Sequence, residues 1–120
     1  MALSARFQKL AADAKSRIRE VSPREASEIQ KRGAVLIDVR EKEEFSKEHA
    51  RGAIHLSRGT IELKIEEQVP DTAAPMVCYC GGGSRSALVA DNLQKMGYTN
   101  VVSMASGFKG WKDQGLATDS

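Results

Sequence analysis

The chain has 120 residues, which is typical of one compact domain, and 41% of them are apolar, enough for a hydrophobic core. These values exclude a two-domain organisation and argue against intrinsic disorder and a disulfide-stabilised scaffold. The net charge of +2 is too small for a protein that binds nucleic acid through bulk charge.

No segment approaches the ~18–20 apolar residues of a membrane-spanning helix, and no secretory signal follows Met1. We therefore expect a soluble, cytoplasmic protein with neither a membrane nor a nucleic-acid partner. Cys78 and Cys80 are too few for a structural zinc site, and their spacing would strain a disulfide. We expect both to be free thiols and no metal to be bound.

The first predicted element is an amphipathic helix in an N-terminal extension, residues 1–19. Its apolar residues recur at helical spacing and form one stripe, which consists of Leu3, Phe7, Leu10, Ala14 and Ile18. Such a stripe needs a partner surface, so we expect it to pack on its own domain, on a second copy in a homodimer, or on another protein. The basic residues and serines of this segment are also found in organellar transit peptides, although its two acidic residues argue against that role.

The predicted domain, residues 20–120, begins with a helix whose start is marked by a capping box. Ser22 is the cap, Pro23 takes the first helical position, Glu25 completes the box, and Gly33 ends the helix. Buried strands are predicted at 34–39, 53–56, 76–79 and 101–104, and further helices at about 41–48, 60–67, 85–96 and 107–114. This alternation predicts an α/β fold, with a mostly parallel central sheet and helices on both faces.

The most informative segment follows the third predicted strand and reads Cys80-Gly81-Gly82-Gly83-Ser84-Arg85-Ser86. Three glycines allow the backbone to curl tightly with its amides toward a central group. Ser84 is placed to cap the next helix, whose positive end, together with Arg85, favours the thiolate of Cys80 and any sulfur anion attached to it. The alternative is a plain tight turn beside a small buried cysteine. Cys78 lies inside the strand and is predicted to be a core residue.

Two charged residues follow the strand at 34–39. Asp38 is expected to hydrogen-bond the Cys80 loop or to orient Arg85, with capping of the helix at 41–48 as the alternative. Arg40 is expected to form a surface ion pair with Glu43 or Glu44.

The remaining candidates carry weaker signals. Arg58 is interpreted either as a contact for an anionic donor at the pocket rim or as a solvated loop residue. We expect His49 and His55 to be structural histidines and Trp111 to be a packing residue.

Four motifs occur in the order and spacing expected of a single-domain rhodanese, a sulfurtransferase family that the chain resembles over about residues 20–116. They are Leu36-Ile37-Asp38-Val39-Arg40 with Glu43-Glu44-Phe45, Glu48-His49-Ala50-Arg51-Gly52-Ala53-Ile54, the Cys80 to Ser86 segment, and Gly107-Phe108-Lys109-Gly110-Trp111. The resemblance implies a rhodanese-like fold and a catalytic Cys80 that accepts a sulfane sulfur as a persulfide. Thiosulfate is the generic donor and a thiol or cyanide the acceptor, with no cofactor. The expected substrate-binding residues are Gly81, Gly82, Gly83, Ser84, Arg85, Ser86 and Arg58, supported by Asp38.

Two alternatives belong to other functional classes. Cysteine phosphatases of the cell-cycle type share this fold but place five residues between cysteine and arginine, whereas four residues, Gly81 to Ser84, separate Cys80 from Arg85 here. The shorter loop suits one sulfur atom better than a tetrahedral phosphate. The second alternative is a rhodanese-like binding module without catalysis.

Overall fold

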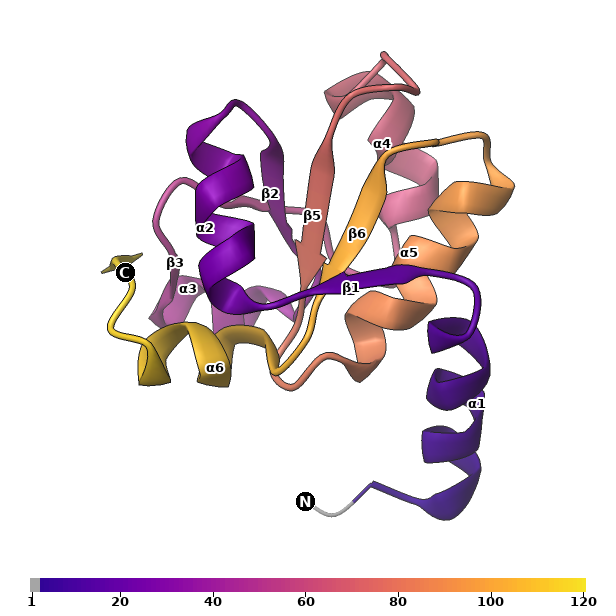
Figure 1. Cartoon of the computed structure of the whole chain (residues 1–120), viewed down its shortest axis with the longest axis horizontal. Helices are drawn as coiled ribbons and strands as arrows, with labels where there is room; N and C mark the ends of the chain where they lie inside the picture. Colours follow the sequence, from indigo (N-terminus) through magenta and orange to yellow (C-terminus); the bar gives the residue numbers. More distant parts are fainter. Residues whose placement is uncertain (1–2) are drawn as a thin grey trace.

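The computed structural model describes residues 3–120, and its centre is a five-stranded parallel sheet (Figure 1). The strands lie in the order β1-β6-β5-β2-β4, and their bounds are β1 (Arg19–Val21), β2 (Val35–Asp38), β4 (Ile54–His55), β5 (Met76–Tyr79) and β6 (Val101–Met104). Every pairing in this sheet is parallel. The four predicted strands are therefore present, and their carboxyl ends share one edge of the sheet.

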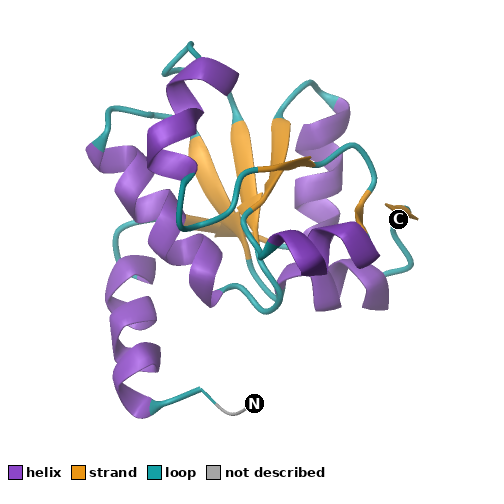
Figure 2. Cartoon of the chain, turned by 180° about the vertical axis from the view of Figure 1, so that it is seen from behind, coloured by secondary structure: helices purple, strands orange, loops and turns teal. Residues whose placement is uncertain are grey.

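Helices cover both faces of the sheet (Figure 2). The helices are α1 (Ala5–Lys15), α2 (Pro23–Lys31), α3 (Lys42–Lys47), α4 (Ile61–Gln68), α5 (Ser84–Lys95) and α6 (Gly107–Asp113). Buried residues of α4 and α5 form one core with β2 and β5, and buried residues of α2 and α6 form a second core on the opposite face. The predicted α/β fold class is confirmed. None of the described helices is long and apolar enough to cross a membrane.

Three short strands were not anticipated from the sequence. β1 adds an edge strand to the sheet, and β3 (His49–Ala50) pairs with β7 (Thr118–Asp119) as a separate antiparallel ribbon. Each has only two or three residues, too few to show an alternating pattern, and each is defined by a partner far away in the sequence.

The N-terminal helix forms as expected, but its contact surface differs from the predicted stripe. Ala11 and Ala14 are the buried residues of α1, which packs against α5. Leu3 and Leu10 keep 50% and 53% of their surface exposed. Ile18 lies beyond the end of the helix and, as predicted for the stripe, packs against the core. Small side chains therefore let the two helices approach closely, while the larger apolar ones lie at the margin. Residues 1 and 2 of the predicted extension lie outside the described residues, and the division at residue 19 stays a prediction.

A buried alanine makes the docking of α1 testable. Replacing Ala14, which is 1% exposed, by Glu should force a charge into the contact with α5 or detach the helix. We expect a loss of about 1–3 kcal/mol in the free energy of unfolding, measured by thermal or denaturant unfolding. Ala12→Glu makes the same chemical change at an exposed position of the same helix and should have little effect. Equal stability of the two variants would contradict the packing of α1 on the domain.

Candidate active site

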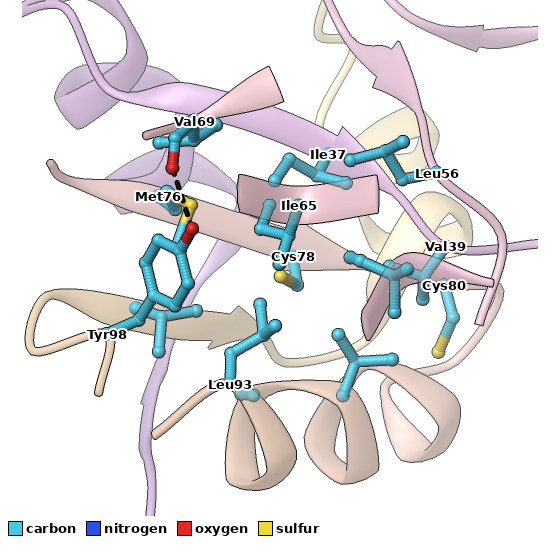
Figure 3. Close-up of a cluster of buried hydrophobic side chains, with 14 residues drawn as sticks. Ile37, Val39, Leu56, Ile65, Val69, Met76, Cys78, Cys80, Leu93 and Tyr98 are labelled. Carbon is cyan, nitrogen blue, oxygen red and sulfur yellow. Dashed lines mark hydrogen bonds between the residues drawn. The ribbon is translucent and has the colours of Figure 1, made fainter. Parts of the chain in front are cut away.

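The two cysteines lie on the α4 and α5 side of the sheet, at very different places in the fold. Cys78 is completely buried within β5, and its thiol lies among core side chains that include Ile65 and Leu93 (Figure 3). This burial raises the pKa of Cys78 to about 12, so its thiol stays protonated at neutral pH. The predicted core role of Cys78 is confirmed. Cys80 follows the end of β5, directly before the glycine loop.

The glycine loop brings a backbone amide to the sulfur of Cys80. The amide of Gly83 donates a hydrogen bond of 3.0 Å to Sγ, and Gly83 has a left-handed φ of +105° that favours glycine. Gly83 also occupies the cap position of α5, whose first residue is Ser84. The prediction that the Ser84 side chain caps this helix is wrong, because no side-chain cap is present and the Cys80 sulfur takes the amide of Gly83 instead.

A pair of serines lies beneath the thiol. The hydroxyl of Ser86 is 3.5 Å from Sγ of Cys80 and 2.8 Å from the hydroxyl of Ser103 on β6. Both serines are completely buried. Ser86 was predicted to bind substrate, and the structure places it on the protein side of the sulfur. Ser103 was not identified from the sequence, because only the pairing of β5 with β6 brings it here.

The amino end of α6 holds the other side of the loop. The amide of Phe108 donates to the carbonyl oxygen of Cys80 at 2.7 Å, and the amide of Lys109 donates to that of Gly81 at 3.2 Å. Engaged in this way, the two carbonyl oxygens cannot turn toward a negative charge at the thiol. Gly107 makes the approach possible, since a Cβ atom there would lie 2.6 Å from the carbonyl oxygen of Gly81. Gly107 begins the fourth motif of the sequence, but its contact with the Cys80 loop was not predicted.

Arg85 does not present a free charge to the pocket. Its guanidinium donates to both carboxylate oxygens of Glu44 on α3, at 2.9 and 3.2 Å. The hydrogen bond from Arg85 lowers the pKa of Glu44 below its ordinary value, so the pair is ionised at neutral pH. Glu44 also accepts a hydrogen bond from the amide of Glu41, which fixes it at the start of α3. Glu44 is therefore the residue that positions Arg85.

Two predictions about the end of β2 are wrong. Asp38 does not hydrogen-bond the Cys80 loop, orient Arg85 or cap α3; its two carboxylate oxygens accept hydrogen bonds from Arg40, the shortest of 2.7 Å. Arg40 is 6% exposed and lies over the ring of Phe108, so it does not form the expected surface pair with Glu43 or Glu44. The physical reason is the burial of both side chains, because a buried charged group needs a partner of opposite charge. Asp38 is the carboxylate that is buried beside Arg40.

A pocket of about 600 Å³ opens over the loop. Its lining consists of Cys80, Gly82, Ser84, Arg85, Arg58, Leu3 and Phe7. Arg58 thus lies at the pocket, which is the position required of a contact for an anionic donor. Cys80 itself is only 1% exposed, so a reactant must enter this pocket to reach the sulfur.

The histidines take no part in this pocket. His49 and His55 are hydrogen-bonded to the backbone carbonyl oxygens of Phe45 and Arg40, and Trp111 is buried with its indole N–H donating to Ala117. These structural roles agree with the expectation. Residues 3–120 contain no group of three or more His, Cys, Asp or Glu side chains arranged to hold a metal ion.

Comparison with known proteins finds one matching family and several similar sulfurtransferases. Residues 22–114 match the family described as "Rhodanese-like domain". The chain is 37% identical over 102 residues to a thiosulfate sulfurtransferase GlpE of Haemophilus influenzae, covering 85% of this chain and 95% of that protein. It is 33% identical over 103 residues to the GlpE of Coxiella burnetii, covering 85% and 94%.

Solved structures extend the likeness to the whole chain. The polysulfide-sulfur transferase homodimer of Wolinella succinogenes has a TM-score of 0.83 and 26% identity, covering 96% of this chain and 88% of that one. A Rhodopseudomonas palustris protein of unknown function, described as "Possible Tyrosine Phosphatase", has a TM-score of 0.84 and 28% identity, covering 99% and 98%.

Proposed function

The chain belongs to the rhodanese-like domain family, and we propose that it moves a sulfane sulfur from a donor such as thiosulfate to a nucleophilic acceptor through a persulfide on Cys80. It is a rhodanese-type sulfurtransferase, similar over most of its length to thiosulfate sulfurtransferases. The observation that carries the role of Cys80 is the 3.0 Å hydrogen bond from the Gly83 amide to its sulfur, at the floor of a pocket.

The proposed first step transfers one sulfur atom and no net electrons. The Cys80 thiolate attacks the outer sulfur of thiosulfate; a new S–S bond forms, the original S–S bond breaks, and sulfite leaves with the bonding pair. The negative charge of the resulting persulfide lies over the glycine loop, where backbone amides and the positive end of α5 stabilise it. An acceptor such as cyanide or a thiolate then attacks the terminal sulfur and restores the thiolate of Cys80.

The loop supports sulfur transfer over phosphate hydrolysis. Four residues separate Cys80 from Arg85, and the guanidinium of Arg85 is already paired with Glu44. A phosphate monoester would need that guanidinium for its own oxygens. The chain should therefore hydrolyse no aryl phosphate, although one protein of similar structure carries the description of a phosphatase.

Intact mass spectrometry tests the proposal most directly. Incubation with thiosulfate should add one sulfur atom per chain, fragmentation should place it on Cys80, and cyanide or dithiothreitol should remove it. The same preparation should not hydrolyse p-nitrophenyl phosphate. A chain that gains no sulfur but hydrolyses the phosphate ester would establish the phosphatase alternative.

Glu44 provides a test of the electrostatics. Glu44→Gln removes the charge that neutralises Arg85, so the guanidinium should attract anionic donors more strongly. We expect the KM for thiosulfate to fall about threefold with kcat nearly unchanged, because a half-exposed charge contributes well under ~1 kcal/mol. Glu43→Gln makes the same change at an exposed neighbouring position and should leave KM unaltered. A raised KM in the Glu44 variant alone would mean that positioning by Glu44 outweighs its charge.

The two free thiols support a cytoplasmic location. A homodimer through α1 is supported by the exposure of Leu3 and Leu10, and light scattering would measure its mass.

A further inference from the structure

The helix α1 precedes the residues that match the family, yet it is fixed to the domain. Arg17, just after its end, donates to both carboxylate oxygens of Asp91 on α5 at 3.0 and 2.7 Å, and the side chain of Gln94 donates to the carbonyl oxygen of Arg17 at 2.9 Å. Ala11 and Ala14 are buried at the contact with α5. Since α5 begins at the glycine loop, the position of α1 is set relative to Cys80.

The amino end of α1 reaches the active-site pocket. In Figure 1 this end lies at the same end of the molecule as the loop between β5 and α5. Ser4 caps the helix by accepting a hydrogen bond from the amide of Phe7 at 3.1 Å, which holds Leu3 and Phe7 in place around the helix start. Both side chains line the pocket that contains Cys80. The pocket therefore has an apolar wall that the matched family region, residues 22–114, does not supply.

The charges around the same pocket are few. Arg85 and Arg58 both line it, but the charge of Arg85 is balanced by Glu44. Arg58 forms no ion pair with any residue of the described chain. One arginine without an ion-pair partner thus lines the pocket together with the apolar wall, a combination that complements a single negative charge attached to an apolar group.

We infer that Leu3 and Phe7 are specificity-determining residues, which select monoanionic sulfane-sulfur donors with an apolar body, such as an aromatic thiosulfonate, over thiosulfate. The inference rests on the proposed function of Cys80. The Cys80 thiolate would attack the outer sulfur of R–SO₂–S⁻, the S–S bond of the donor would break, and the sulfinate R–SO₂⁻ would leave with the bonding pair. Thiosulfate carries two negative charges and has no apolar group, so it gains nothing from the wall and must lose more hydration on entry.

The test compares donors that share one reacting group. Benzenethiosulfonate and methanethiosulfonate anions have the same charge and the same leaving chemistry, and they differ in the apolar body. With cyanide as acceptor, the unmodified chain should use the aromatic donor with a kcat/KM about tenfold higher. Phe7→Ala should reduce this ratio to about two, because kcat/KM falls most for the aromatic donor, whose ring loses its apolar contact.

Leu10→Ala is the matched control. Leu10 lies on the same helix and is also a large apolar residue, 53% exposed, but it does not line this pocket, so the donor ratio should stay at its original value. Circular dichroism should show that both variants keep the helical content of the parent chain.

The results of this experiment distinguish a failure of donor selection by Leu3 and Phe7 from a failure of sulfur transfer by Cys80. If thiosulfate forms the persulfide on Cys80 in every variant but the donor ratio is near one or is unchanged by Phe7→Ala, the apolar wall does not select donors and the inference is overturned. If no donor adds sulfur to Cys80, the proposed function is overturned as well.

Discussion

Replacing Cys80 by Ser should abolish sulfur transfer while leaving the chain folded. A serine hydroxyl stays protonated at neutral pH and its oxygen is a poor nucleophile toward sulfur, so no persulfide can form. The serine hydroxyl can still accept the hydrogen bond that the Gly83 amide donates to the cysteine sulfur at 3.0 Å, so the loop should keep its conformation. We expect turnover with thiosulfate and cyanide to fall at least ~10³-fold, and intact mass spectrometry to detect no added sulfur.

Cys78→Ser is the control for this variant. Cys78 is completely buried among apolar side chains, so its hydroxyl replacement should cost about 1–3 kcal/mol of unfolding free energy and leave turnover measurable. Because burial raises the pKa of Cys78 to about 12, iodoacetamide at neutral pH should modify Cys80 and spare Cys78. An inactive, folded Cys78 variant beside an active Cys80 variant would reverse the assignment.

The predicted elements that proved correct are those defined by local patterns. The capping box of α2 forms in both directions between Ser22 and Glu25, because all its partners lie within one turn of chain. The strands at 76–79 and 101–104 are buried on both faces, so their sequences are apolar runs in which Ser103 is the one interruption. The alternation of such strands with helices along the chain is enough to predict the α/β architecture without knowledge of the tertiary contacts.

The parts that could not be predicted depend on contacts between distant segments. Glu44 comes to Arg85 across 41 residues of chain, and Ser103 comes to Ser86 across 17. The partner of Arg40 could not be predicted because Asp38, Glu43 and Glu44 all lie within four residues of it, and the burial of both Arg40 and Asp38 in the folded chain selects Asp38. The stripe on α1 was correct only in part, since close helix packing buries Ala14 of the stripe together with Ala11 and leaves the larger leucines exposed.

Gly107 shows how a residue outside the pocket can determine the geometry of the reacting loop. It has a φ of +54°, and a Cβ atom at this position would lie 2.6 Å from both the carbonyl carbon and the carbonyl oxygen of Gly81. Neither contact involves a flexible side chain, so the backbone of the loop or of α6 must move. The hydrogen bonds from Phe108 and Lys109 to the loop carbonyls would lengthen or break.

Gly107→Ala should therefore reduce kcat/KM for sulfur transfer about 100-fold, since a displacement of about 1 Å in a reacting group has an effect of that size. Gly115→Ala is the matched control, because Gly115 lies just after the same helix, has a φ of +71° and has no atom within 4 Å of its would-be Cβ. Both variants should pay the backbone strain of a left-handed alanine, about 1–2 kcal/mol. Only Gly107→Ala should also lose activity, measured as the rate of persulfide formation on Cys80 in variants confirmed to be folded by circular dichroism. Equal activity in the two variants would mean that α6 does not hold the loop, and that the amides around the sulfur keep their positions without it.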